Sequence, residues 1–223
     1  MALLSPSVAR MSASLITSIR LLEELGCQSV HIDACHDMTL PNFFDLREVR
    51  TAWSQHARVS ASLHIFQLNN SLPDVSFLTS KDLAMLHLFP ETAPSFIEGF
   101  VAVSQESGCR VGLAVDVRTK LDVVVPYLDL LDTVFMMAIP VATYGREPDR
   151  RLNERIKGIR DMIEKLRSPC RLGIDGGVSN NTFHAMTNMV DELVVGSILF
   201  DSTDLPSRWA ELSSIADCAK EKT

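Results

Sequence analysis

The chain of 223 residues lacks several features that would place it in common classes of protein. It has no uninterrupted apolar run that approaches the ~18 residues of a membrane-spanning helix. Basic residues are in deficit, because 21 lysines and arginines stand against 28 aspartates and glutamates, a formal net charge of −7. This excess of acidic residues argues against nonspecific electrostatic binding to the phosphate backbone of nucleic acids. We therefore expect neither a nucleic-acid partner nor a membrane partner.

Cysteines are few, and their spacing matches no metal-binding knuckle. The five are Cys27, Cys35, Cys109, Cys170 and Cys218. An odd number without such spacing fits reduced thiols better than a disulfide framework. At the N-terminus no basic region precedes the apolar residues, and Pro6 follows too early for a signal peptide. Together these absences predict a cytoplasmic protein.

Linkers, low-complexity tracts and blocks of like charge are also absent. Apolar residues make up 46% of the chain and charged residues 22%, which is ordinary globular composition. The length is sufficient for one large core. We expect a single domain over residues 1–223.

Short apolar runs alternate with segments of helical periodicity. We expect eight strands, near 2–8, 29–34, 59–66, 84–89, 110–115, 133–139, 170–175 and 192–195. The expected helices lie near 12–25, 44–55, 73–80, 93–107, 119–128, 150–167, shortly after 177, and at 205–218. Strict alternation predicts parallel strands with right-handed crossovers, and eight such units close as a (β/α)8 TIM barrel. An open doubly wound sheet is the alternative, but the first turn, Ser5-Pro6-Ser7, is not a glycine fingerprint.

Metal-type ligands stand at the expected C-terminal ends of three strands. His31 and Asp33 share one face of a strand because alternate side chains point the same way. His64 ends the third strand and Asp175 ends the seventh. Any one of them alone is more often a hydrogen-bonded structural group, but residues at these ends line the mouth of a barrel. Two imidazoles and two carboxylates there predict a divalent-metal site with acid/base groups, for Zn²⁺, Fe²⁺, Mn²⁺ or Co²⁺.

Other chemically active side chains near this site have more ordinary interpretations. We expect His87, on the fourth strand, to pack inside the barrel rather than to bind a metal. His36, in the loop after the second strand, is equally suited to touching a substrate and to facing solvent. The sulfur-containing side chains of Cys35, Met136 and Met137 are core filling by default.

Two loops near the C-terminus have the composition of a phosphate site. Gly176 and Gly177 follow the seventh strand, and Gly196 and Ser197 follow the eighth. Glycines between a strand and a helix leave backbone N–H groups open to an anion, and barrels commonly bind phosphate after strands seven and eight. An anionic small substrate is therefore compatible with the negative net charge.

Taken in order, these residues resemble the ribulose-phosphate 3-epimerase family over nearly the whole chain. The specific part is the pattern His-x-Asp…His…Asp-Gly-Gly-Val, formed here by His31, Asp33, His64 and residues 175–178. Supporting matches are Pro6-Ser7, Pro41-Asn42, Val111-Gly-Leu-Ala, Met137 and Gly196-Ser197. The resemblance implies a phosphate-binding barrel and a homo-oligomer.

The resemblance also implies roles for individual residues. One divalent ion would be bound by His31, Asp33, His64 and Asp175, with Cys35 and Met137 as metal-adjacent candidates. Asp33 and Asp175 would be catalytic acid/base groups on opposite faces of a ketose phosphate. The substrate and its phosphate would be held by Ser7, His64, Gly145, Gly176, Gly177, Gly196 and Ser197.

The implied reaction inverts carbon 3 of ribulose 5-phosphate or xylulose 5-phosphate, or of a close pentulose or hexulose phosphate. Inversion next to a ketone removes one proton and returns another to the opposite face, through an enediolate that a cation stabilises. One base cannot easily reach both faces, which accounts for two carboxylates.

Several loops depart from the family's usual pattern. After the His-x-Asp the chain reads Ala34-Cys35-His36-Asp37, and Phe66 takes the place of a methionine near the metal. The usual Pro-Gly-Thr after strand five is Val117-Arg118-Thr119, and one glycine, Gly145, survives in the loop after strand six. A relative that binds sugar phosphate or metal without turnover is therefore one alternative. Another isomerase or an aldolase-type lyase on the same barrel is a second, whereas the Asp-x-Lys-x-x-Asp of related decarboxylases is missing.

Overall fold

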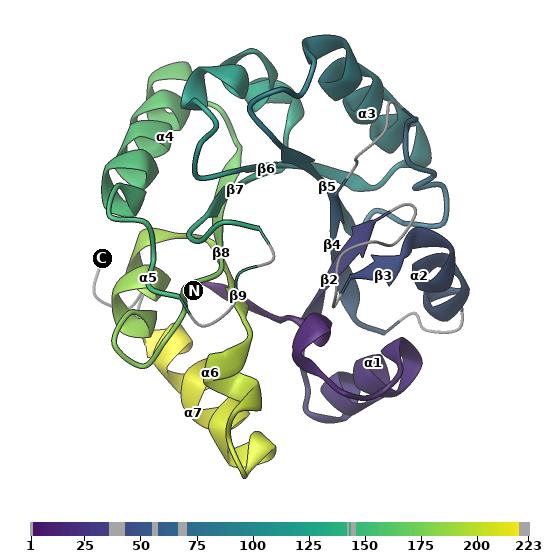
Figure 1. Cartoon of the computed structure of the whole chain (residues 1–223), viewed down its shortest axis with the longest axis vertical. Coiled ribbons are helices and arrows are strands. Elements are labelled where there is room, and N and C mark those ends of the chain that lie inside the picture. Colours follow the sequence, from purple (N-terminus) through teal and green to yellow (C-terminus); the bar gives the residue numbers. More distant parts are fainter. Residues whose placement is uncertain are drawn as a thin grey trace.

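The computed structural model describes residues 2–35, 43–54, 58–66, 71–141, 143 and 146–218. Within them, parallel strands form one sheet in the order β1-β9-β8-β7-β6-β5-β4-β2-β3. The strands are β1 (Leu3–Pro6), β2 (Ser29–Cys35), β3 (Phe44–Asp45), β4 (Ser60–Phe66), β5 (Leu83–Leu88), β6 (Arg110–Val115), β7 (Thr133–Met137), β8 (Arg171–Asp175) and β9 (Glu192–Val195). Figure 1 shows the sheet curled into a ring with helices around its outside.

The ring closes between the first strand and its two neighbours. β1 pairs with β9 from Leu3 opposite Glu192 to Pro6 opposite Val195. On its other side, an isolated parallel bridge joins Ser7 to His31 of β2. β3 adds only two residues beside the end of β2. The expected eight-stranded parallel barrel is therefore confirmed, with β3 as a small addition to it.

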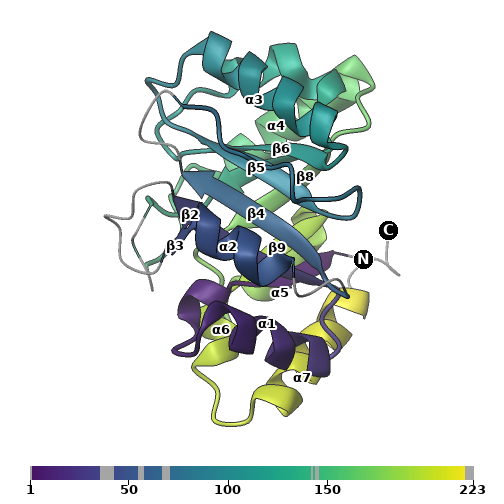
Figure 2. The same ribbon diagram turned by 90° about the vertical axis from the view of Figure 1, so that its right-hand side faces the viewer.

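Helices cover the outer face of the barrel (Figure 2). They are α1 (Leu15–Glu24), α2 (Leu46–Trp53), α3 (Pro94–Ser107), α4 (Leu152–Leu166), α5 (Phe183–Met189), α6 (Ser197–Phe200) and α7 (Leu205–Cys218). In α1, Leu15, Ile19 and Leu22 recur at helical spacing and are buried. The hydroxyl of Ser14 accepts a hydrogen bond from the Thr17 N–H and caps this helix.

Two expected helices are wrong. Residues 73–80 contain turns, because the Asp74 carboxylate accepts hydrogen bonds from the N–H and hydroxyl of Ser76. Such local side-chain bonds offer the backbone an alternative to helix. Residues 119–128 form two 3₁₀ helices, η2 (Leu121–Val123) and η3 (Val125–Leu130). A run of valines lowers helix propensity there, and Pro126 lacks the N–H that an α-helix would need.

The start of the chain also differs from expectation. The first strand ends at Pro6 rather than near residue 8, and a 3₁₀ helix, η1 (Val8–Arg10), follows Ser7. This turn brings the chain across the end of the barrel next to β9, since the Ser7 N–H donates to the Val195 carbonyl. The difference matters because it places Arg10 near the loops that follow β8 and β9.

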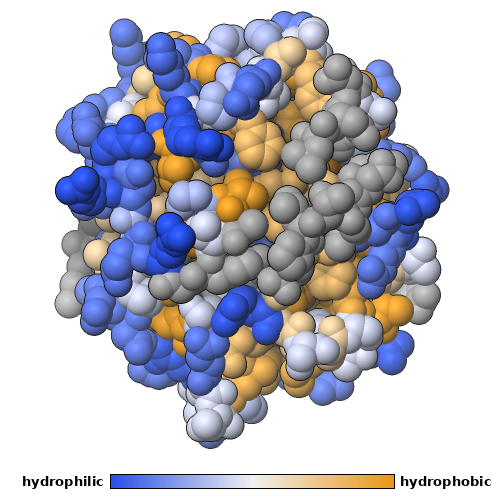
Figure 3. Space-filling view, in the orientation of Figure 1, coloured by the Kyte–Doolittle hydropathy of each residue, from blue (hydrophilic) through white to orange (hydrophobic). Residues whose placement is uncertain are grey.

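The side chains of the sheet divide into two layers. Val30, Ile32 and Ala34 of β2 face the helices and belong to the large core between sheet and helices. The alternate side chains face the barrel interior, which is filled by Leu83, Met85, Ala114, Val117, Phe135, Met137 and Val194. The interior is therefore packed rather than open, and polar groups collect at the C-terminal ends of the strands. Figure 3 shows apolar side chains that reach the surface near the centre of this view and hydrophilic ones around its periphery.

Candidate metal and acid/base site

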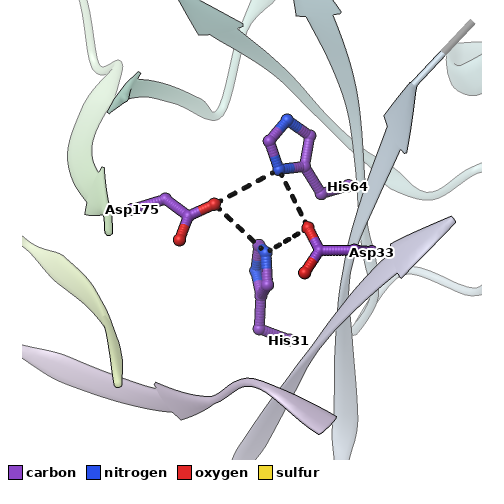
Figure 4. Close-up of side chains that lie close together, drawn as sticks. All are labelled: His31, Asp33, His64 and Asp175. Carbon is purple, nitrogen blue, oxygen red and sulfur yellow. Dashed lines mark hydrogen bonds and ion pairs between the residues drawn. The ribbon is translucent and has the colours of Figure 1, made fainter. Parts of the chain in front are cut away.

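Four side chains that the sequence singled out meet at the C-terminal end of the barrel. They are His31 and Asp33 of β2, His64 of β4 and Asp175 at the end of β8. One ligand atom from each lies within 4.8 Å of the others. Figure 4 shows the two carboxylates on opposite sides of the two imidazoles. The expected convergence of these four residues is thus what the structure shows.

The strand register explains how this cluster forms. Asp33 and His64 are direct partners in the parallel pairing of β2 with β4. His31 lies two residues before Asp33 and therefore projects into the same interior. Asp175 comes from β8, on the other side of the ring (Figure 1). Each of these positions follows from strand pairing, so the cluster is built on rigid elements.

The donor atoms have the spacing of a metal site. His31 Nε2 lies 3.3 Å from Asp33 Oδ1 and 3.5 Å from Asp175 Oδ2. His64 Nδ1 lies 3.5 Å and 3.4 Å from the same two oxygens. Donors bound at ~2.1 Å around a tetrahedral ion lie about 3.4 Å apart. Among the described residues His64 Nδ1 is buried without a hydrogen-bond partner, so the residues present fit a divalent ion.

In the cluster, the charges of neighbouring side chains oppose the effect of burial on each pKa. Burial alone would lower the pKa of His31, yet the charges of Asp33 and Asp175 outweigh it and raise that pKa to about 10. Burial alone would raise the pKa of each carboxylic acid, but the charge of His31 holds the pKa of Asp33 and of Asp175 below the usual range. The two carboxylates are therefore ionised and in need of positive charge, which a proton on His31 or a cation between the ligands supplies.

A cavity opens beside this cluster. Five of the residues expected to bind substrate or phosphate line it, namely Ser7, Gly176, Gly177, Gly196 and Ser197, together with Asp33, Asp175 and Met137, whereas His64 is not among its lining residues. Cys35 instead packs with Phe43 and Phe66 in a separate apolar cluster. Gly145, His36 and the pair Pro41-Asn42 lie outside the described residues.

The loop after β8 has a conformation that favours glycine. Gly176 and Gly177 have φ angles of 90° and 66°, in the left-handed region. A Cβ at Gly176 would lie 2.6 Å from Ile139 Cγ1, and one at Gly177 would lie 2.9 Å from Pro148 Cγ. The missing side chains thus bring bare backbone up to the cavity wall, next to Asp175.

Arg10 also lines the cavity, and sequence reasoning missed it. Its Nη2 donates to Asp201 Oδ1 at 3.1 Å, just beyond α6. Its aliphatic stem passes Gly196, where a Cβ would lie 3.3 Å from Arg10 Cγ. The only signal in the sequence is a cationic residue three positions after Ser7, and the expected strand gave no reason to place it here.

Sequence reasoning also missed the contact between His87 and Asp116, which lie behind His64. His87 is buried, as expected, but its Nδ1 is 3.1 Å from His64 Nε2, and its Nε2 is 3.7 Å from Asp116 Oδ2. Burial lowers the pKa of His87 to about 4, so this imidazole is neutral near pH 7. Burial would raise the pKa of Asp116, but the nearby His87 ring and the hydrogen bonds from Arg118 hold that pKa well below its usual range. The sequence signal was an acidic residue directly after a strand.

Within the described part of the chain, every helix is too short or too polar to cross a lipid bilayer. This agrees with the lack of a long apolar run in the sequence.

The fold is that of a TIM barrel. Two solved structures share this fold: KGPDC from Streptococcus mutans, with a TM-score of 0.66 and 9% identity over 99% of both chains, and 3-hexulose-6-phosphate synthase from Salmonella typhimurium. The latter has a TM-score of 0.61 and 13% identity, over 97% of this chain and 99% of its own. At such low identities the likeness concerns the fold alone.

Sequence comparison gives the family. The model of the ribulose-phosphate 3 epimerase family matches residues 3–200, and the chain belongs to that family. Ribulose-phosphate 3-epimerase of Escherichia coli K12 is 24% identical over 184 residues, 80% of each chain. That of Buchnera aphidicola is 28% identical over 122 residues, a match that spans about half of each protein, 54% of this chain and 53% of the other. The chain is accordingly an isomerase-class enzyme, an epimerase acting on carbohydrates.

Proposed function

We propose that the protein is a metal-dependent epimerase that inverts carbon 3 of a ketose phosphate. The observation that carries the proposal is the pair of ionised carboxylates, Asp33 and Asp175, which reach the same centre from β2 and β8. Each turns one oxygen toward the histidine nitrogens and leaves the other outside that contact (Figure 4). A site that only bound metal or sugar would have no need of two bases so placed.

The chain's own residues would move the proton. One group, as an ionised carboxylate, takes the proton from carbon 3, and the other, after it has taken up a proton from solvent, returns that proton from the opposite face as a carboxylic acid. Both carboxylates are largely but not fully buried, with side chains 13% and 14% exposed, so their proton exchange with solvent runs through the cavity that they line. A divalent ion held by His31, Asp33, His64 and Asp175 would stabilise the negative charge that develops on the substrate oxygens.

The cavity would orient the substrate through its phosphate. Gly176, Gly177, Gly196 and Ser197 line one side of it, where backbone N–H groups of glycine loops can bind an anion. Arg10 lies on the same wall and adds a cation that suits a phosphate dianion. Ser7, hydrogen-bonded through its backbone to Val195, would help to order this end of the site.

We also infer that residues 1–223 work as one domain. The pairing of β1 with β9 joins the first and last strands of the described chain in the same sheet, so neither strand can be removed without opening the barrel. A truncation that deletes β9 and still yields a folded, active protein would contradict this.

Solvent exchange at carbon 3 tests the proposed reaction. Purified protein supplied in turn with Zn²⁺, Fe²⁺, Mn²⁺ and Co²⁺ would be incubated with ribulose 5-phosphate in D₂O and followed by NMR, with six-carbon ketose phosphates in parallel. We expect deuterium at carbon 3 together with the epimer. Asp33→Asn and Asp175→Asn should each abolish turnover, whereas Ser7→Ala should be milder.

The outcomes separate the alternatives. Exchange without the epimer would show that only one carboxylate reaches the substrate. No exchange with any ketose phosphate and any metal would refute the epimerase proposal. Retained epimerisation in either Asp→Asn variant would refute the role of two bases.

A further inference from the structure

A chain of buried polar side chains leads away from the candidate metal site. His64 Nε2 lies 3.1 Å from His87 Nδ1, and His87 Nε2 lies 3.7 Å from Asp116 Oδ2. All three residues are at most 1% exposed. Their polar atoms therefore have no access to bulk water and depend on one another for hydrogen bonding.

Asp116 is fixed in place from its other side. Its Oδ1 accepts hydrogen bonds from the Arg118 N–H at 2.9 Å and from Arg118 Nε at 3.0 Å. Its backbone carbonyl accepts one from Arg155 Nη2. Oδ2 is left facing His87 Nε2, and neither of these two atoms has a hydrogen bond to any other described residue. A movement of about 0.5 Å would close a hydrogen bond between them.

Aromatic rings enclose the same chain of residues. The Phe66 ring stacks on His87 with centroids 4.6 Å apart and lies 4.1 Å from the ring of His64. Phe89 contacts the His87 ring at 4.5 Å. These contacts restrict both imidazole planes and exclude water, so the direction of each hydrogen bond is determined by the protein.

The direction follows from the group at the far end. An ionised Asp116 can only accept, so His87 must hold its proton on Nε2. His87 Nδ1 and His64 Nε2 lie 3.1 Å apart, so one of them donates and the other accepts; with the His87 proton on Nε2, Nδ1 accepts and His64 must donate from Nε2. The lone pair of His64 consequently lies on Nδ1, the atom that faces Asp33 and Asp175.

We propose that His87 and Asp116 are positioning residues that fix the tautomer and ring orientation of His64 as a metal ligand. The proposal rests on the proposed metal site and adds to it two residues that touch neither metal nor substrate. Outer partners of this kind typically change metal affinity 10- to 100-fold when they are replaced. The class of ligand served is a divalent cation that binds imidazole nitrogen.

The first test reads the tautomers directly in the wild-type protein. Zn²⁺ is diamagnetic, so long-range ¹H–¹⁵N correlations of the zinc-loaded, ¹⁵N-histidine-labelled protein report which nitrogen of His64 and His87 carries the proton. We expect Nε2–H on both rings. A His87 protonated on Nδ1 would overturn the proposal, whether or not any variant folds.

The second test replaces the acceptor Asp116, which ends the series of hydrogen-bonded side chains, by a residue that can donate. In Asp116→Asn the amide can donate to His87 Nε2, which favours the opposite direction of every bond. We expect His87 to change to its Nδ1–H tautomer and the affinity for Zn²⁺, measured by competition with a chelator, to fall 10- to 100-fold. Zinc affinity within threefold of wild type in a folded Asp116→Asn protein would overturn the proposal.

Asp82→Asn is the matched control. Asp82 is a fully buried carboxylate that precedes β5 and accepts from the Ala61 N–H and the Trp53 indole. Its replacement should leave zinc affinity within twofold. If wild-type protein bound none of the tested metals, the proposed metal site itself would fail. If wild type bound zinc and Asp116→Asn bound it equally well, only the positioning role would fail.

Discussion

Replacing Gly176 by alanine should destabilise the protein and impair the site for a reason that the geometry makes explicit. Gly176 has a φ of 90°, and a Cβ there would lie 2.6 Å from Ile139 Cγ1 and 3.0 Å from Ile139 Cδ1. A non-glycine residue in this conformation costs about 1–2 kcal/mol. Displacing the well-packed Ile139 side chain should cost a further 1–3 kcal/mol, roughly. The free energy of unfolding should therefore fall by about 2–5 kcal/mol.

Denaturant unfolding of the metal-free protein would measure this loss, and a double-mutant cycle would divide it. Ile139 is 7% exposed, so Ile139→Ala alone should cost about 2–4 kcal/mol. In the double variant the overlap with Gly176→Ala is gone. The losses of the two single variants, added together, should therefore exceed the loss of the double variant by about 1–3 kcal/mol, which is the cost of the steric overlap. Of the cost of Gly176→Ala, only the backbone strain remains in the double variant.

Gly158→Ala is the matched control for this cycle. Gly158 lies within α4 at an ordinary helical φ, and its Cβ would lie 3.2 Å from the flexible end of Leu121. Alanine should be neutral or should stabilise the helix by up to about 1 kcal/mol. Additive losses, within about 0.5 kcal/mol, for Gly176→Ala and Ile139→Ala would refute the steric argument. Equal losses for Gly176→Ala and Gly158→Ala would refute the conformational one.

Further predictions concern charge. The pKa of His31, raised to about 10 from 6.5, means that its stabilisation of the metal-free protein is complete below pH 6.5 and is lost as the pH rises toward 10. The melting temperature should fall over that interval, and His31→Gln should flatten the profile. Arg10→Ala should raise KM for the ketose phosphate about tenfold with kcat nearly unchanged, as expected for a lost charge-assisted bond. Arg208→Ala, whose guanidinium bonds Glu211 and the Ile198 carbonyl, should leave KM unchanged, and equal KM values for both variants would contradict the role of Arg10.

The barrel and the four clustered side chains could be predicted because both follow from short-range rules. Alternation of strand and helix implies parallel pairing, and the period of two places His31 and Asp33 on one face. Parallel strands then bring their C-terminal ends to one end of the barrel, which adds His64 and Asp175. None of these steps depends on the details of a loop.

The errors and omissions depend on loops and on side chains that bond to nearby backbone. In the segment 73–80, hydrogen bonds of the Asp74 side chain stabilise turns in place of the expected helix. Within 119–128, Pro126 lacks a backbone N–H, and 3₁₀ helices form in place of the expected α-helix. Arg10 reaches the cavity only because η1 turns the chain toward β9. Asp116 reaches His87 across the pairing of β5 with β6, a contact between residues that no local pattern connects.

Two of the departures from the family's usual pattern, Phe66 and the segment with Arg118, lie close to His64 and His87 or to their partner Asp116. Phe66, which takes the place of a methionine, packs on both His64 and His87. Arg118, in the altered segment after β6, holds the oxygen of Asp116 that His87 does not face. On the other side, the chain keeps the sequence Asp-Gly-Gly-Val at the end of β8, with both glycines at positive φ. If the proposed metal site holds, a change around His64, with Asp33, Asp175 and the glycine loops after β8 and β9 retained, should alter metal affinity more than proton transfer.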